Sequence, residues 1–250
     1  MRTIYIKEIR SFLSSFIAYI VIVVFLIANG LFMWIFEDTN VLDFGYANMD
    51  TLFELSPWIL MFLVSAITMR SFSEEKKVGT IETLTTKPIS DLSIIMGKFF
   101  AGFTLVLFSL LPTIIYFYSV YQLGETAGNI DTGATFGSYL GLLMLGGVYV
   151  AIGIFASAIT ENQIVSFVLS LFVCFIFYMA FDYLGNLDAF KGTDFFLEWI
   201  GINFHYRSIS KGVLDTRDVI YFLSLTGLFI WLTKIVFESR KWQKREEGIK

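Results

Sequence analysis

The chain has 250 residues and a formal net charge of −4 at pH 7; 56% of its residues are hydrophobic and only 16% are charged. Soluble domains carry about a quarter charged residues, so this composition excludes an ordinary soluble domain and favours an integral membrane protein. The single cysteine, Cys174, excludes both a disulfide framework and a cysteine-rich metal site.

The residues that precede the first long apolar stretch predict an amphipathic helix over residues 1–15. Its apolar face comprises Tyr5, Ile6, Ile9, Phe12, Leu13 and Phe16, and its polar face comprises Lys7, Arg10, Ser11 and Ser14. A basic amphipathic helix of this kind lies in the membrane interface. A simple basic anchor for the first span is the alternative.

Six apolar stretches can each cross a bilayer, which takes roughly 20 helical residues. Their expected bounds are 16–36, 52–70, 99–120, 139–159, 164–184 and 219–237. Pro112 lies inside the third stretch and is expected to kink it. We therefore predict an all-α integral membrane protein in which residues 16–250 form one six-span domain.

Basic residues are distributed unequally between the two sides that these spans define. Fourteen lysines and arginines lie near the two termini or after the second span, whereas four lie in the remaining connections. Because cytoplasmic segments carry the excess of basic residues, both termini and the connection after the second span are predicted to be cytoplasmic. The chain is accordingly expected to cross its membrane several times with these segments on the cytoplasmic side.

The connection after the second span, SEEKKVGTIETLTTKPIS (Ser73–Ser90), is polar and contains strong helix-breaking residues. We expect Ser73 to cap a short helix and Gly79 to break it. A second short helix follows until Pro88 turns the chain, and Ser90 then caps the third span.

The second short helix is expected to carry an apolar ridge formed by Val78, Ile81 and Leu84, which are three residues apart. So small a loop cannot bury this ridge. The residues alone leave two alternatives open, in which the ridge either dips into the membrane interface or docks on a cytoplasmic partner.

Three features elsewhere have structural interpretations. Gly137 and Gly141 form a G-x-x-x-G pattern, which is expected to pack within the chain, with a pairing surface as the alternative. His205 is the only histidine and is expected to be structural. The apolar segment Phe195–Phe204 predicts an interfacial or re-entrant helix rather than a solvated loop.

The stretch EEKKVGTIETLTTKPIS resembles the corresponding connection in ABC type-2 exporter permeases. Three further stretches are similar to the N-terminal helix and first span, the tight inner turn and the approach to the sixth span of that family. They read YIKEIRSFLSSFIAYIVIVVFL, AITENQIVSFVLS and SISKGVLDTRDVIYFLS. The resemblance covers almost the whole chain and is strongest to the permease associated with gliding motility.

This resemblance implies a permease subunit in a bacterial inner (plasma) membrane. It would work as a pair of six-span units, each docked on a separate cytoplasmic ABC ATPase. The connection Ser73–Ser90 would be the coupling helix, which carries ATPase motion into the spans. A membrane or periplasmic motility subunit is a further partner that the resemblance suggests. The partner ATPase would bind ATP and magnesium, so no cofactor, metal or nucleic acid is expected on this chain.

The resemblance also implies which residues meet the ATPase. Gly79 and Pro88 would set the angle of the coupling helix. Its apolar contacts would be Ile81 and Leu84, its polar contacts would be Glu75, Thr80 and Glu82, and the inner turn would add Glu161.

Two other classes of protein are alternatives to a permease. An intramembrane enzyme needs a nucleophile with a base, or carboxylates with histidine, inside the spans, and the sequence lacks such a set and any phosphate-binding loop. A non-transporting scaffold that passes ATPase motion to an envelope partner stays open, because the same coupling residues would serve it.

Overall fold

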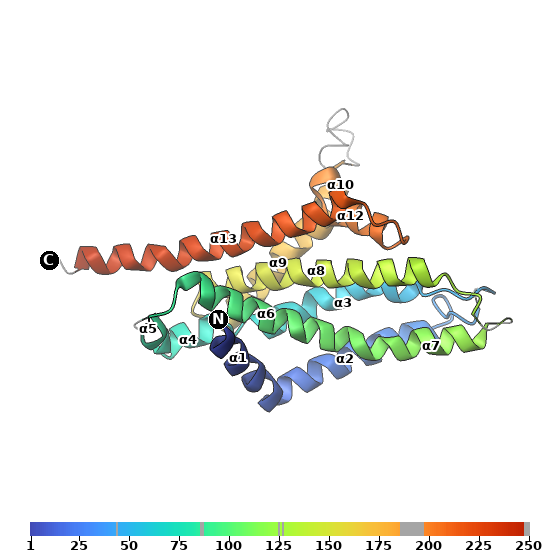
Figure 1. The fold of residues 1–250 in the computed structure, drawn as a ribbon, viewed down its shortest axis with the longest axis horizontal. Coiled ribbons are helices and arrows are strands. Elements are labelled where there is room, and N and C mark those ends of the chain that lie inside the picture. The colour runs from blue at the N-terminus through green and yellow to red at the C-terminus, as the bar shows by residue number, and fades with distance from the viewer. Residues whose placement is uncertain (44, 86–87, 125, 127, 186–197, 248–250) are drawn as a thin grey trace.

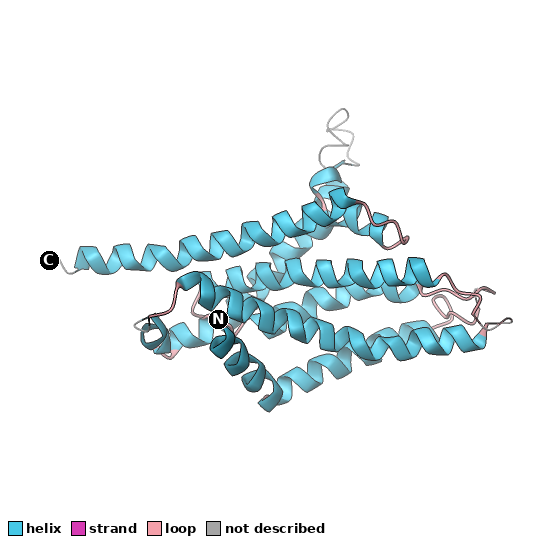
Figure 2. Ribbon diagram, in the orientation of Figure 1, coloured by secondary structure: helices cyan, strands magenta, loops and turns pink. Residues whose placement is uncertain are grey.

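The computed structural model describes residues 1–43, 45–85, 88–124, 126, 128–185 and 198–247. Within these ranges every regular element is a helix, which confirms the predicted all-α architecture. The long helices run side by side in an elongated bundle (Figures 1 and 2).

The first half of the chain comprises α1 (Arg2–Ser14), α2 (Phe16–Trp34), α3 (Asp50–Thr68), α4 (Ser73–Lys77), α5 (Thr80–Thr85), α6 (Asp91–Leu110), the 3-10 turn η1 (Leu111–Thr113) and α7 (Ile114–Leu123). The second half comprises α8 (Thr132–Ile159), α9 (Gln163–Phe175), the π-helical segment η2 (Ile176–Ala180), α10 (Phe181–Gly185), α12 (Ile202–Ile209) and α13 (Thr216–Glu247).

Five helical stretches are long and apolar enough to cross a membrane. They are Asp50–Lys77, Asp91–Leu123, Thr132–Ile159, Gln163–Gly185 and Thr216–Ser239. The pair Arg2–Ser14 and Ala18–Trp34 passes the same test but is bent by 69°, and the number becomes six if this pair forms one span. The apolar part of the first stretch is α3, and the charged α4 follows it.

Several span boundaries differ from those expected. The third stretch begins at Asp91, where Ser90 accepts a hydrogen bond from the Ser93 backbone nitrogen at 3.3 Å, so the predicted cap is confirmed. Pro112, where a kink was expected, lies in the 3-10 turn η1, which interrupts the α-helix between α6 and α7. Polar residues at the helix ends extend the fourth and sixth stretches beyond their apolar cores, which the apolar pattern could not show.

The most enclosed helix is α8, which packs against α3, α6, α9, α12 and α13. Its glycines allow this close packing. A Cβ atom on Gly153 would lie 1.9 Å from Thr68 Oγ1, and one on Gly146 would lie 2.5 Å from Val106 Cγ1. Larger side chains at these positions would push α3 and α6 away from α8.

The G-x-x-x-G pattern lies near the start of α8 and packs within the chain. A Cβ atom on Gly137 would lie 3.1 Å from the Cα atom of Gly212, and one on Gly141 would lie 2.8 Å from Ile209 Cγ2. Both glycines therefore seat α12 and the turn after it, which agrees with the intrachain interpretation.

Figure 1 shows that α1 and the C-terminal part of α13 lie at the same end of the bundle as α4 and α5. The connections from α2 to α3 and from α7 to α8 lie at the opposite end. This is the arrangement of connections that the distribution of basic residues predicts.

Candidate functional site

The Ser73–Ser90 connection forms the helix pair α4–α5 at one end of the bundle (Figure 1). Gly79 separates the two helices and has a φ of +75°. Only glycine adopts this left-handed conformation without strain, so the predicted break at Gly79 is confirmed. A Cβ atom there would meet nothing within 4 Å, which means that the backbone angle alone requires glycine.

Ser73 is the first residue of α4 and does not cap it, so that prediction is wrong. The Ser73 hydroxyl donates to the Met69 carbonyl instead. The hydroxyl oxygen of Ser157, in α8, accepts hydrogen bonds from the backbone nitrogens of Phe72 at 2.7 Å and Ser73 at 3.0 Å. Because the start of α4 is buried against α8, a residue from that helix reaches its free N–H groups.

A second contact holds α4 to the same end of α8. The Lys76 ammonium donates a hydrogen bond to the carbonyl of Ala158, one residue beyond Ser157. That carbonyl lies in the last turn of α8, where backbone acceptors lack partners within the helix. The short helix α4 is therefore fixed to α8 at both ends.

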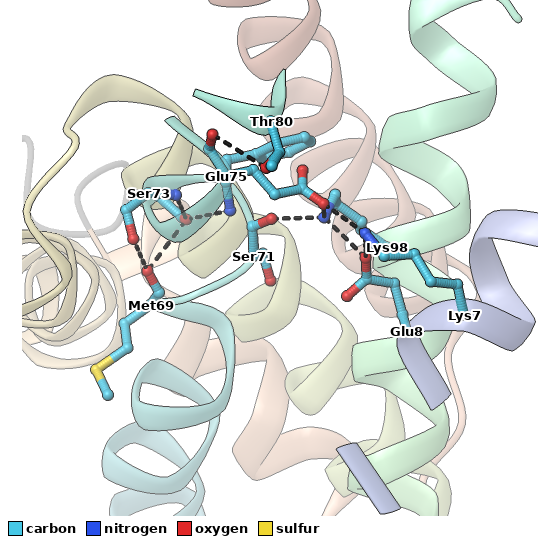
Figure 3. Close-up of polar contacts among 10 residues, drawn as sticks. Lys7, Glu8, Met69, Ser71, Ser73, Glu75, Thr80 and Lys98 are labelled. Carbon is cyan, nitrogen blue, oxygen red and sulfur yellow. Dashed lines mark hydrogen bonds and ion pairs between the residues drawn. The ribbon is translucent and has the colours of Figure 1, made fainter. Parts of the chain in front are cut away.

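Four charged side chains, Lys7, Glu8, Glu75 and Lys98, form a closed cluster that we call the charge ring (Figure 3). The Lys98 ammonium lies 2.9 Å from Glu8 Oε1 and 3.0 Å from Glu75 Oε1. The Lys7 ammonium lies 2.7 Å from Glu75 Oε1 and 3.5 Å from Glu8 Oε1. The signs alternate around the ring, which joins α1, α4 and α6.

Lys98 is the buried centre of the ring, with 3% of its surface exposed. Its ammonium also donates to the carbonyl of Ser71 at 2.5 Å and lies 4.9 Å from the centroid of the Phe72 ring. The Phe72 ring in turn packs on Phe237 of α13, with centroids 4.6 Å apart. Phe72 therefore connects the surroundings of Lys98 to the C-terminal helix α13.

The charge ring shifts the pKa values of Glu75 and Lys7, both of which lie outside the apolar helices. Burial disfavours the charged Glu75 carboxylate, but the Lys98 charge and the Lys7 hydrogen bond outweigh it, so the pKa of Glu75 lies below its usual value. Partial burial also opposes the charge on Lys7, but the hydrogen bond and charge of Glu75 and the interaction with Glu8 together outweigh it and raise the pKa of Lys7. Both groups therefore stay ionised at neutral pH.

The residues that α1 buries are not those of its predicted apolar face. Ile4 and Glu8 are its buried residues. A Cβ atom on Gly97 of α6 would lie 3.0 Å from Ile4 Cγ2, and the Tyr5 hydroxyl lies 3.1 Å from Thr104 Oγ1. An acid on the flank of a basic helix, and a lysine at the start of an apolar span, were the signals that could have indicated this pairing.

The structure divides the predicted ATPase contacts between two sides of α4–α5. Ile81 is 8% exposed and belongs to the hydrophobic core, and the Glu75 carboxylate points to Lys98. Val78, in contrast, is 67% exposed. Two residues of the predicted apolar ridge therefore point in different directions: Ile81 faces the bundle and Val78 faces away from it.

The remaining predicted contacts lie on the surface or outside the described side chains. Thr80, Glu82, Pro88 and Glu161 are exposed. Leu84 belongs to α5, but its side chain lies outside the described part of the chain. The Glu161 turn joins α8 to α9, both of which contact α4.

A polar recess lies at the opposite end of the bundle. Its volume is about 1160 Å³, and α3, η2, α10 and α12 contribute to its wall. Acidic, basic and aromatic side chains mix there, among them Glu54, Trp58, Asp182 and Arg207. The recess is separate from the α4–α5 pair.

His205 has structural contacts at that opposite end. Its Nδ1 atom lies 2.7 Å from Asp218 Oδ1 and its Nε2 atom lies 2.9 Å from the carbonyl oxygen of Trp199. No group of residues in the described ranges could hold a metal ion. The predicted segment Phe195–Phe204 lies partly outside those ranges; its described part is helical at 198–200 and again in α12.

The fold and the site define a multi-pass helical membrane protein that presents a charged helix pair at one end. The chain matches the sequence model of the family described as "ABC-2 family transporter protein" over residues 2–241. Because this match covers almost the entire chain, the protein belongs to the ABC-2 family. A search of curated proteins found no match. Members of this family are membrane components of ABC transporters that work with a cytoplasmic ABC ATPase, as the resemblance implied.

Proposed function

We propose that this protein is the permease subunit of an ATP-driven exporter in a bacterial inner membrane, with both termini and α4–α5 in the cytoplasm. A separate ABC ATPase would bind and hydrolyse ATP. The observation that carries the proposal is the α4–α5 pair, which is tied to the bundle on one side and exposed on the other.

The exposed side of α4–α5 supplies the contact with the ATPase. Val78 would be the apolar contact residue, and the exposed Thr80 and Glu82 lie beside it. Ile81 and Glu75 face the bundle, so their role is to hold the helix pair in place rather than to meet the ATPase.

The bound side of α4–α5 passes movement into the membrane. Helix α3 ends at Thr68 and α4 begins at Ser73, so the two are connected by four residues. The contacts from Ser157 and Lys76 tie the same helix to α8. A force on Val78 would therefore reach both α3 and α8.

We further propose that two copies of the permease form the working unit and that each binds one ATPase. This pairing rests on the resemblance to type-2 exporters. Cross-linking of the chain in native membranes should then yield a dimer. A product that stays monomeric in the presence of the ATPase would contradict the pairing.

We also propose that the protein takes part in gliding motility, which rests on the resemblance alone and is tested separately. Deletion of the gene should abolish gliding while leaving growth intact. Transport in inverted vesicles then separates an exporter from a scaffold that performs mechanical work on an envelope partner, because only the exporter moves a solute in an ATP-dependent manner.

The central experiment measures ATPase binding by a Val78→Arg variant. The chain is co-expressed with each tagged ABC ATPase of the same genome, and the bound amounts are compared at equal permease levels. Burial of such a side chain contributes about 1.5–3 kcal/mol, and a buried charge adds a desolvation cost. Binding should therefore fall about 10-fold or more.

Tyr46→Arg is the matched control, since Tyr46 is a similarly exposed apolar residue, 64% against 67%, in the connection at the opposite end. This variant should retain the ATPase. Equal retention by both variants would show that α4–α5 is not the docking site. Failure of every ATPase to bind the parent chain would contradict the proposed function itself.

A further inference from the structure

We propose that Lys98 is a positioning residue that makes α1 move together with α4, so that the charge ring carries ATPase motion to the first span as well as to α3 and α8. The inference rests on the proposed function, because it assigns the route by which movement of α4 spreads. It concerns the residues that lie behind the docking surface rather than the surface itself.

The charge ring connects three helices through four side chains. Lys7 and Glu8 belong to α1, Glu75 belongs to α4 and Lys98 belongs to α6. Each lysine touches both carboxylates (Figure 3). Without Lys98, the carboxylates of α1 and α4 would face each other with Lys7 as their shared cation.

The two lysines of the charge ring are unequally buried. The Lys98 side chain is 2% exposed, whereas that of Lys7 is 55% exposed. Water and salt screen an exposed charge far more than a buried one, so Lys98 supplies most of the attraction. Its three N–H donors meet Glu8, Glu75 and the Ser71 carbonyl, which uses its full donor capacity.

Helix α1 lies directly before α2, the first apolar helix. The chain bends by 69° between α1 and the helix that continues from Ala18. A displacement of α1 must therefore change the angle at which α2 begins. Ile4 and Tyr5 also hold α1 against α6, so α1 is a rigid attachment rather than a free tail.

Charged side chains fix the position of α1 against α4 more specifically than apolar side chains would. Buried ion pairs contribute little net stability compared with apolar packing, and their best-attested use is to specify one arrangement of elements. Removing one partner is costly, because an uncompensated charge is left buried. The ring therefore admits one register of α1 against α4, whereas an apolar contact would allow sliding.

The Lys98 connection can be tested separately from the contacts that hold α4 to α8. Ser157 and Lys76 do not belong to the ring, and they fix α4 whether or not Lys98 is present. Lys98→Met keeps the length of the side chain and removes its charge. It should release α1 from α4 while α4 stays on α8.

The experiment measures distances between spin labels by pulsed electron paramagnetic resonance in nanodiscs, on a Cys174→Ala background. Exposed positions carry the labels: Arg10 reports on α1, Glu74 on α4 and Thr132 on the far end of α8. Without the ATPase, the distance between the labels at positions 10 and 74 (the 10–74 distance) should be narrowly distributed in the parent protein. It should broaden in Lys98→Met.

The same labels then follow the complex with the ATPase after vanadate trapping of ATP. In the parent, the 74–132 and 10–132 distances should both shift. In Lys98→Met the 74–132 shift should persist and most of the 10–132 shift should be lost. A purely structural role for Lys98 would reduce both shifts together.

Lys77→Met is the matched control, because it removes an exposed lysine from the end of α4. It should preserve both shifts, and Lys98→Arg should restore most of the 10–132 shift by keeping the charge. If Lys98→Met fails to fold, the double variant Glu8→Gln with Lys98→Met removes one charge of each sign. It should fold, and its 10–74 distance should still broaden.

The outcomes separate the two proposals. A narrow 10–74 distribution and a full 10–132 shift in Lys98→Met or in the double variant would overturn the role of Lys98, while a persistent 74–132 shift keeps the proposed function. No shift of either pair in the ATPase-bound parent would contradict the proposed coupling instead.

Discussion

The hydroxyl oxygen of Ser157 lies 2.7 Å from the backbone nitrogen of Phe72, so the last turn of α8 caps the start of α4. The two residues are 85 positions apart in the chain. This contact joins the most enclosed helix of the bundle to the short helix that we propose to meet the ATPase.

Ser157→Ala should loosen α4 without unfolding the bundle. The backbone N–H groups of Phe72 and Ser73 would lose their acceptor, and a buried unsatisfied donor costs about 1–3 kcal/mol. Hydrogen exchange should therefore accelerate in α4 and leave α8 protected.

Ser119→Ala is the control, because the Ser119 hydroxyl donates only within its own helix, to Ile115. This variant should leave exchange in α4 unchanged. Equal exchange in the Ser157 variant and the parent would show that α4 does not depend on this cap.

Gly153→Ala should destabilise the bundle. Its Cβ atom would lie 1.9 Å from Thr68 Oγ1, which is held by a hydrogen bond to the Val64 carbonyl at 2.7 Å. Overpacking of this kind typically costs about 1–3 kcal/mol. Thermal unfolding in detergent, followed by size-exclusion chromatography, should show a lower midpoint.

Gly227→Ala provides the comparison, since a Cβ atom at this helical glycine would meet nothing within 4 Å. Its midpoint should equal or slightly exceed that of the parent, because alanine favours helix over glycine. The packing of α3 on α8 would be contradicted if both variants unfolded at the parent's midpoint.

His205→Phe should weaken the junction of α12 with α13. Phenylalanine can keep the stacking on Tyr221, whose ring centroid lies 3.9 Å from that of His205. The buried Asp218 carboxylate, however, loses the donor at 2.7 Å. Loss of a partner for a buried acceptor costs about 1–3 kcal/mol or more, so the thermal midpoint should fall.

Asp218→Asn in the His205→Phe background should recover part of that loss, because it removes the unpaired buried charge. A single variant as stable as the parent would mean that the histidine contact contributes nothing to stability.

The predicted orientation can be checked by labelling single cysteines on a Cys174→Ala background. A membrane-impermeant maleimide added to spheroplasts should label Tyr46→Cys and should reach Val78→Cys only after lysis. Both side chains are exposed, so access to the reagent depends on the side of the membrane. Labelling of position 78 from outside would reverse the topology and remove α4–α5 from the cytoplasm.

The apolar stretches were sufficient to predict an all-helical membrane protein, and local residues predicted the Gly79 break, the Ser90 cap and the Pro112 interruption. Each of these depends on a few neighbouring residues. Helix boundaries were less predictable, because polar residues extend α8 and α13 beyond their apolar cores.

Most contacts of the candidate site could not be predicted from the sequence. Lys98 and Glu8 are 90 residues apart, and Ser157 reaches α4 from another helix. Such pairings depend on how helices pack, which periodicity along one helix does not show. Ile81 illustrates the same limit: helical spacing placed it on the ridge with Val78, but the packing of α5 turns it inward.

Site-specific photocross-linking tests the central claim most directly. A photoreactive amino acid is placed at Val78 or at Tyr46, and cells that contain the ABC ATPase are irradiated before the products are separated. We expect a cross-link between position 78 and the ATPase, and none from position 46 at the opposite end. A cross-link from position 46, or none from position 78 while the ATPase co-purifies, would contradict the assignment of α4–α5 as the docking site.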